Sequence, residues 1–286
     1  LMIKVAQVVA NEFGIGLERV KIMATSTAKV PNTSPTAASS GSDLNGMAAR
    51  DACLQIKASI SGFVAKEKCG PDEVRFEGGR VIAGDLDQSW EEAVKSAYLA
   101  RTKLFAAGYY ATPKIHFDRT SFSGRPFLYY AYGAAVSEAV IDLTTGETRI
   151  VRVDILHDCG TSLNPAIDRG QIEGGFIQGM GWLTSEELVF DDKGRLRTHA
   201  PSTYKIPTAG DRPPELRIEF WDEPNREETI YRSKAVGEPP LMLAISAFSA
   251  IWATVAAARV DGSAPPLDAP ATPERVLLAA IGDAHA

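Results

Sequence analysis

Small and hydroxyl-bearing residues fill the segment PNTSPTAASSGSD, residues 31–43, directly before a predicted helix. The first N–H groups of a helix have no partner within the helix, so this segment offers several hydrogen-bond donors to an anionic ligand. Small side chains would also let a bulky ligand lie close to the backbone. Composition alone favours the alternative, a serine-rich surface loop that ends in a helix cap.

Glycine is dense in the segment GQIEGGFIQGMGW, residues 170–182, which has the pattern of a helix. Each interior glycine costs a helix up to about 1 kcal/mol relative to alanine, so another group must approach this backbone closely. The spacing favours a second helix as that group. The alternative is a flat cofactor that accepts a hydrogen bond from Gln171 or Gln178, which share one helix face.

A carboxylate, Glu238, lies just before a strongly apolar helix in the segment SKAVGEPPLMLA, residues 233–244. An acidic side chain at this place ordinarily interacts with the helix dipole. In a cleft the same carboxylate could act as a general base, because partial burial strengthens a carboxylate as a proton acceptor. The residues alone favour the ordinary role and leave the catalytic one open.

Other kinds of chemistry find little support in the pattern. No G-x-S-x-G segment occurs, and the four histidines form no recognisable pairing with serine or cysteine, which argues against a nucleophile triad. Cys53, Cys69 and Cys159 lack C-x-x-C spacing and indicate free thiols in a reducing cytoplasm. A net charge of -6 argues against a nucleic-acid partner. We predict no membrane span and expect the apolar stretch 241–258 to be core.

Helices and strands alternate irregularly along the 286 residues, which predicts an α+β fold with mixed, mainly antiparallel sheets and packed helices. A chain of this length forms one large domain or two lobes. The predicted helices are 2–13, 43–66 with Ser42 or Asp43 as its cap, one from Ser89, 164–182, 237–259 and 273–281. The predicted strands are 20–23, a hairpin near 73–82, 127–141 and 148–156, with Gly146 in the last connecting turn.

Four strings in a fixed order carry a family resemblance. They are VPNTSPTAAS at 30–39, SLNPAIDRGQIEGGFIQGMG at 162–181, PSTYKIP at 201–207 and SKAVGEPPLMLA at 233–244. Together they closely resemble the molybdenum-binding subunit or domain of the xanthine dehydrogenase and aldehyde oxidase family. The first string is more similar to the xanthine-oxidising branch. The resemblance implies that residues 1–286 are the C-terminal portion of a molybdenum-cofactor-binding domain whose upstream lobe precedes the sequence.

The resemblance also implies roles for particular residues. A cofactor-binding set would wrap the molybdopterin, with the backbone N–H of Ala38 near the metal, and comprises Thr36, Ala37, Ala38, Ser39, Gly41, Ser42 and Gln171. At position 41 some relatives have serine, so only a backbone contact is expected there. Glu238 would be the catalytic base that removes a proton from a hydroxyl group on the metal, so that its oxygen attacks the purine.

As a whole, the resemblance implies an oxidoreductase that hydroxylates hypoxanthine and xanthine with water-derived oxygen. Iron–sulfur clusters and FAD are expected on other domains or subunits, and the enzyme is expected to be a cytoplasmic oligomer. Two alternatives stay open. One is an aldehyde or N-heterocycle hydroxylase of the same family, and the other is a non-catalytic cofactor-binding or assembly module in which Glu238 only caps a helix.

Overall fold

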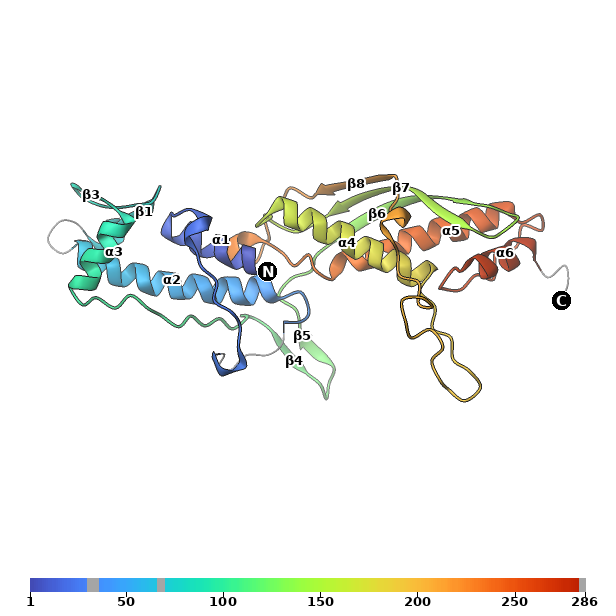
Figure 1. Cartoon of the computed structure of the whole chain (residues 1–286), viewed down its shortest axis with the longest axis horizontal. Helices are drawn as coiled ribbons and strands as arrows, with labels where there is room; N and C mark the ends of the chain where they lie inside the picture. Colours follow the sequence, from blue (N-terminus) through green and yellow to red (C-terminus); the bar gives the residue numbers. More distant parts are fainter. Residues whose placement is uncertain (30–35, 66–69, 283–286) are drawn as a thin grey trace. The chain divides into compact units, whose positions relative to one another are not determined.

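The computed structural model describes residues 1–29, 36–65 and 70–282 of the chain (Figure 1). These residues form two compact units. The first contains Leu1–Tyr130 and Asn225–Ser233, and the second contains Ala131–Pro224 and Lys234–Ala286. Each unit has its own hydrophobic cluster.

The first unit combines three α-helices with two small antiparallel sheets. The helices are α1 (Met2–Phe13), α2 (Gly41–Ala65) and α3 (Trp90–Leu99), with short 3-10 turns η1 (Leu17–Arg19), η2 (Thr27–Lys29), η3 (Pro71–Glu73) and η5 (Ile230–Arg232). One sheet has the order β1 (Arg75–Glu77), β2 (Arg80–Ala83), β3 (Leu86–Ser89), and the other pairs β4 (His116–Asp118) with β5 (Ser123–Arg125).

Local signals fix the ends of these elements. α1 stops at Gly14, whose φ of 63° places it in the left-handed region that glycine tolerates. α3 starts with a capping box, in which the Glu92 N–H donates to Ser89 Oγ and the Ser89 N–H donates to Glu92 Oε2. The core between α2, β2 and α3 consists of Ile60, Val64, Val81, Ala83 and Ala93.

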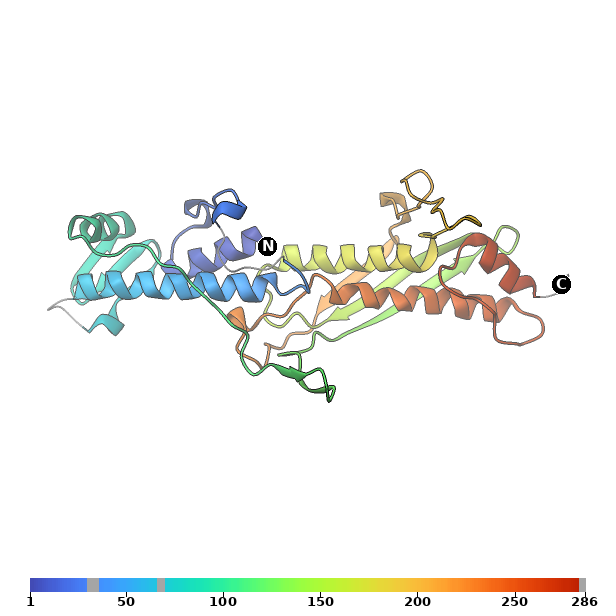
Figure 2. The same ribbon diagram turned by 90° about the horizontal axis from the view of Figure 1, so that it is seen from below.

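The second unit is a three-stranded sheet with helices packed on it. The strands are β6 (Gly133–Ile141), β7 (Thr148–His157) and β8 (Glu215–Phe220), and the helices are α4 (Pro165–Thr184), α5 (Ile245–Ala258) and α6 (Pro273–Ile281), with 3-10 turns η4 (Ala209–Asp211) and η6 (Pro239–Ala244). β6 and β7 are antiparallel, whereas β7 and β8 are parallel. Figure 2 shows α4 and α5 running side by side along the sheet.

Apolar stripes of the helices meet the inner face of this sheet. Ile172 and Phe176 of α4 and Ile251 of α5 are fully buried against Val153 of β7 and Ile218 of β8. The tight connection between β6 and β7 uses Gly146 at a φ of 75°. A buried layer of this kind holds α4 and η6 at fixed places relative to the sheet.

Most predicted elements are confirmed. The α+β fold, with mainly antiparallel sheets, is present, and the predicted helices 2–13 and 273–281 match α1 and α6. α2 begins at Gly41, so Ser42 and Asp43 lie in its first turn and the prediction that one of them is the cap is wrong. Residues 31–35 of the hydroxyl-rich segment, Lys66 and Cys69 lie outside the described residues.

Three predicted elements differ from the structure. Residues 20–23 pair with no described strand, and the predicted strand 127–141 becomes regular only at Gly133. The predicted helix 237–259 is divided into the 3-10 turn η6 and the helix α5. β3, β4, β5 and β8 were not predicted.

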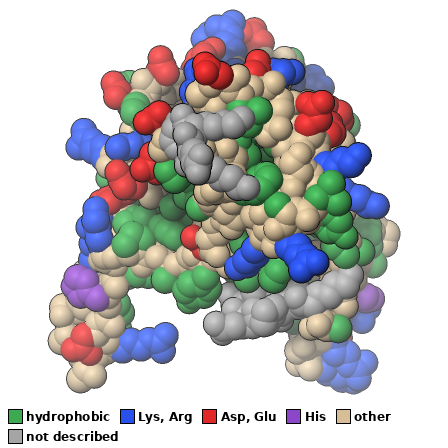
Figure 3. Space-filling model, turned by 90° about the vertical axis from the view of Figure 1, so that its left-hand side faces the viewer, with side chains coloured by type: hydrophobic (Ala, Val, Ile, Leu, Met, Phe, Trp, Pro, Cys, Tyr) green, Lys and Arg blue, Asp and Glu red, His purple; other side chains and the backbone are tan. Residues whose placement is uncertain are grey.

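One apolar stretch and the distribution of surface charge bear on possible partners. The stretch Pro239–Ala258 is long and apolar enough to cross a membrane. Its residues Ala247, Ile251 and Val255 pack in the core of the second unit, as the sequence predicted for a core helix. On the face shown in Figure 3, acidic and basic side chains are interspersed and form no patch of a single charge.

Candidate functional site

The hydroxyl-rich loop enters α2 through an unusual backbone turn. Ala38 and Ser39 have φ values of 55° and 53°, in the left-handed region that residues with a side chain rarely adopt. Ser40 closes the turn by donating from its N–H and from Oγ to the carbonyl of Ala37, at 3.3 and 3.0 Å. Backbone strain of this kind persists only where the surrounding structure holds it in place. Strained residues cluster at active sites and ligand-binding loops.

The exposure of the loop agrees with a binding role. Thr36, Ala37 and Ala38 are exposed and Ser39 is half-buried. The first helical hydrogen bond of α2 joins the Leu44 N–H to Ser40 O. The preceding N–H groups therefore have no helical acceptor and can donate to a ligand.

Buried contacts hold the start of α2. A Cβ at Gly41 would lie 3.0 Å from Leu1 and 3.2 Å from Thr36, so a serine there would crowd the loop. Asp43 accepts a hydrogen bond from the Tyr129 hydroxyl at 2.5 Å, and its other oxygen is buried without a hydrogen-bond partner among the described residues. Burial raises the pKa of the Asp43 carboxyl group. These contacts link the loop to the body of the first unit.

Glycines let α4 lie very close to η6 in the second unit. A Cβ at Gly179 would stand 2.3 Å from the carbonyl oxygen of Leu241, and one at Gly175 would stand 3.0 Å from Pro240. The spacing therefore predicted correctly that another helical segment approaches this backbone. Gly170 and Gly174 are different, because a Cβ built there would meet no described atom within 4 Å beyond the neighbouring residues and backbone of α4 itself.

Glu238 and Gln171 both belong to this helix pair. Glu238 precedes η6 as its N-cap residue, with an exposed side chain that makes no capping hydrogen bond. Gln171 is exposed one turn before Gly175 on α4. Because Gly175 faces Pro240 and Gly179 faces Leu241 and Ala244, the two segments run in the same direction and place Gln171 and Glu238 toward the same end.

The predicted site residues thus fall into two groups. Glu238 and Gln171 lie together in the second unit, and the first unit contains Thr36, Ala37, Ala38, Ser39, Gly41 and Ser42. Within the described ranges, no group of three or more His, Cys, Asp or Glu side chains is arranged to hold a metal ion. The resemblance implied that the backbone N–H of Ala38 lies near the metal. In the structure, Ala38 is an exposed residue in the left-handed turn of the loop.

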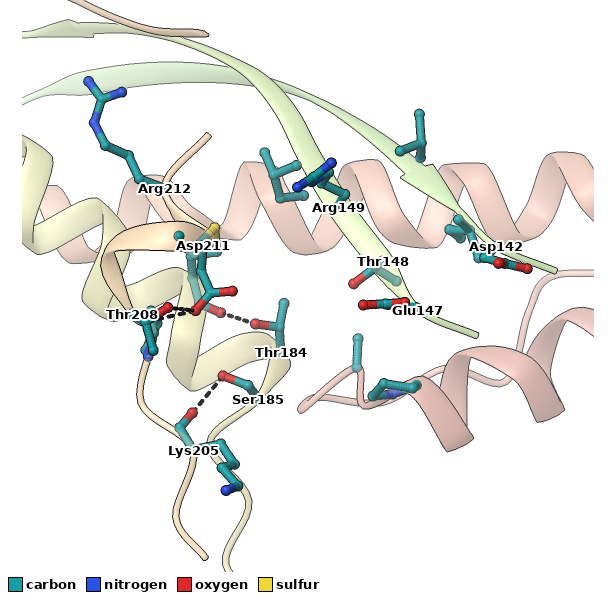
Figure 4. A pocket seen from close by; sticks show the side chains of 18 of the residues that line it. Asp142, Glu147, Thr148, Arg149, Thr184, Ser185, Lys205, Thr208, Asp211 and Arg212 are labelled. Atoms are coloured by element: carbon teal, nitrogen blue, oxygen red, sulfur yellow. Dashed lines mark hydrogen bonds between the residues drawn. The ribbon is translucent and has the colours of Figure 1, made fainter. Parts of the chain in front are cut away.

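Sequence reasoning missed a cavity of about 870 Å³ in the second unit (Figure 4). It lies at the far end of α4, between the β6–β7 turn and residues 205–214. The Ser185 hydroxyl donates to the carbonyl of Lys205 at 2.7 Å on its wall. The string PSTYKIP, which ends in this wall, was the available signal, but nothing in its residue types indicated a cavity.

A buried histidine was also missed. His157 at the end of β7 is 1% exposed, and neither ring nitrogen has a hydrogen-bond partner within residues 1–29, 36–65 and 70–282. Burial lowers the pKa of the imidazole, so the ring is held neutral. The sequence showed only an isolated histidine after a run of apolar residues.

Comparisons with known proteins identify the family of the chain. Residues 1–213 match the family model of the molybdopterin cofactor-binding domain. The chain is 43% identical over 284 residues to the xanthine dehydrogenase/oxidase of Mus musculus, covering 97% of this chain and 20% of that protein. It is also 43% identical over 288 residues to the xanthine dehydrogenase of Oryza sativa subsp. japonica, with the same two coverages.

Solved structures show the same fold. The quinoline 2-oxidoreductase of Pseudomonas putida 86 superposes with a TM-score of 0.76 at 26% identity, covering 97% of this chain and 34% of that one. The aldehyde oxidoreductase of Desulfovibrio gigas gives a TM-score of 0.72 at 25% identity, covering 97% and 27%. The chain thus spans 20% of the length of the curated relatives that it matches. It belongs to the xanthine dehydrogenase-type family of molybdopterin cofactor-binding domains.

Proposed function

We propose that this chain supplies part of the active site of a molybdenum hydroxylase that oxidises purines, with Glu238 as the general base. The observation that carries the proposal is the exposed carboxylate of Glu238. This residue directly precedes η6 and lies toward the same end of the α4–η6 pair as Gln171. The names of the relatives that are 43% identical support a purine as the substrate.

The residues present fit a large anionic cofactor. The exposed loop residues Thr36, Ala37 and Ala38 lead to the helix N–H groups that a phosphate or similar group needs. In the second unit, the open space at Gly170 and Gly174 leaves the α4 backbone accessible beside Gln171. We therefore assign to cofactor binding the loop residues Thr36, Ala37, Ala38, Ser39, Gly41 and Ser42 together with Gln171. When bound, the molybdenum cofactor supplies two-electron redox chemistry.

Glu238 acts as the proton acceptor in this scheme. Hydroxylation replaces a C–H bond of the substrate with C–OH, takes the oxygen from water, and releases two electrons and two protons. The carboxylate of Glu238 accepts one of these protons from the attacking oxygen, which makes that oxygen a better nucleophile. The side chain has neither a capping hydrogen bond nor an ion pair with a described residue, so both carboxylate oxygens are available.

We further propose that residues 1–286 are the C-terminal portion of the cofactor domain. An upstream lobe would complete the cofactor site, and iron–sulfur and flavin domains or subunits would carry the two electrons away in an oligomeric enzyme. A cytoplasmic location is supported by Cys53 and Cys159, which are buried free thiols.

The direct test is steady-state oxidation of hypoxanthine and xanthine by the complete enzyme. Glu238→Gln should lower turnover by about 10²-fold or more at equal molybdenum content, the usual scale for loss of a general base. Glu219→Gln, which removes the same charge from an exposed position on β8, serves as the matched control and should leave turnover unchanged. Normal turnover in Glu238→Gln would contradict the role of Glu238 as the base and leave it as a charge at the start of η6.

The substrate class has its own test. Solved relatives named for quinoline and aldehyde oxidation make an N-heterocycle or an aldehyde the second candidate. Comparing kcat/KM for xanthine, quinoline and an aromatic aldehyde on the same enzyme decides between them. A value for xanthine below that for either of the others would contradict the purine assignment.

A further inference from the structure

The segment that carries Glu238 is attached to the turn that follows β7. The Lys234 N–H donates to the carbonyl of Cys159 at 2.7 Å. The Lys234 ammonium group also donates to Asp158 Oδ2, with 2.5 Å between nitrogen and oxygen. Residues 234 and 158 are 76 positions apart, so this double attachment is a tertiary contact and no local turn produces it.

The ion pair is largely shielded from water. The side chains of Lys234 and Asp158 are 10% and 13% exposed, and the ammonium group also lies 5.5 Å from the centre of the Tyr132 ring. Two hydrogen bonds hold Asp158 in place. Its N–H donates to Tyr132 O, and its Oδ1 accepts from the Gly160 N–H. A buried pair of this kind fixes geometry strongly, since removing one partner leaves the other charge unpaired.

The residues on both sides of Glu238 are held in place. Val236, two residues after Lys234, is 5% exposed in the core. After Glu238 come Pro239 and Pro240, whose rings fix their backbone φ angles. Pro240 packs on Gly175 of α4. Glu238 therefore stands between two fixed points, while no residue in the described part of the chain binds its carboxylate.

We propose that Lys234 and Asp158 are positioning residues for the Glu238 carboxylate. Neither is expected to exchange a proton with the substrate. Their pair sets the path of residues 234–238 and thereby the place from which the base reaches the attacking oxygen. The inference rests on the proposed function, because it requires that Glu238 be the base.

The test measures kcat and KM for xanthine in the complete enzyme at equal molybdenum content. Lys234→Met should lower kcat by about 10-fold or more with little change in KM, because small displacements of a catalytic group have effects of this size. Lys234→Arg keeps the charge and should recover most of the lost rate. Asp158→Asn, which removes the charge while keeping the acceptor for Gly160, should resemble Lys234→Met and provides a second variant if that protein folds poorly.

A double variant separates positioning from general damage. If Lys234 acts through Glu238, adding Lys234→Met to Glu238→Gln should slow the enzyme no further, whereas independent roles would multiply the losses. Multiplied losses, or full turnover in Lys234→Met and Asp158→Asn, would overturn the positioning role alone. Normal turnover in Glu238→Gln would instead overturn the proposed function, so the two failures are distinguishable.

Discussion

Close packing of α4 on η6 gives a prediction whose size follows from the coordinates. A Cβ at position 179 would lie 2.3 Å from Leu241 O and 2.8 Å from Ala244 Cβ, whereas real Cβ contacts essentially never come under 3.0 Å. Gly179→Ala must therefore push η6 away from α4. Overpacking costs about 1–3 kcal/mol, of which the higher helix propensity of alanine offsets up to about 1 kcal/mol.

Gly174→Ala is the matched control on the same helix, because a Cβ there meets no atom within 4 Å. It gains the same propensity without a clash, so the two variants should differ in free energy of unfolding by about 1–3 kcal/mol. Urea unfolding of the chain, followed by the combined fluorescence of its four tryptophans and by circular dichroism, measures this difference. Equal stability of the two variants would refute the packing argument.

Two further predictions concern stability. Burial lowers the pKa of His157, so the folded state resists the proton that the unfolded chain takes up, and stability should fall as the pH drops below about 6.5 by at most about 1.4 kcal/mol per unit. Thermal unfolding between pH 5 and 8 should show a weaker acid dependence in His157→Leu than in wild type; equal slopes in the two proteins would contradict this. Ser89→Ala removes the hydroxyl of the α3 capping box and should cost about 1 kcal/mol in urea unfolding, while an unchanged midpoint would show that the cap contributes nothing.

Local signals explain which elements were predictable. α1 ends at Gly14 and α6 begins after Thr272 at Pro273, and both boundaries depend on residues next to the helix. β8 was missed because it forms only by pairing in parallel with β7, whose partner residues lie more than 60 positions earlier. Residues 20–23 have the composition of a strand, but no described strand pairs with them.

The sequence proposed residues for the candidate site but could not give their geometry. The glycines of α4 indicated close approach, and Gly175 and Gly179 confirm it, although the approaching group is η6. The residue types left the role of Glu238 open, and only the family resemblance implied a catalytic base. Its attachment through Lys234 and Asp158 depends on a tertiary contact that no spacing reveals. That Ala38 would adopt a left-handed backbone could not be foreseen, because alanine itself disfavours that conformation.

The most direct test of the central claim is a single turnover that isolates the chemical step at Glu238. Complete enzyme, matched for molybdenum content, is mixed rapidly with xanthine without an electron acceptor, and the rate of cofactor reduction is followed by absorbance. The account predicts that Glu238→Gln lowers this rate by about 10²-fold or more, while substrate still binds and Glu219→Gln reacts like wild type. Reduction at the wild-type rate in Glu238→Gln would contradict the assignment of Glu238 as the base.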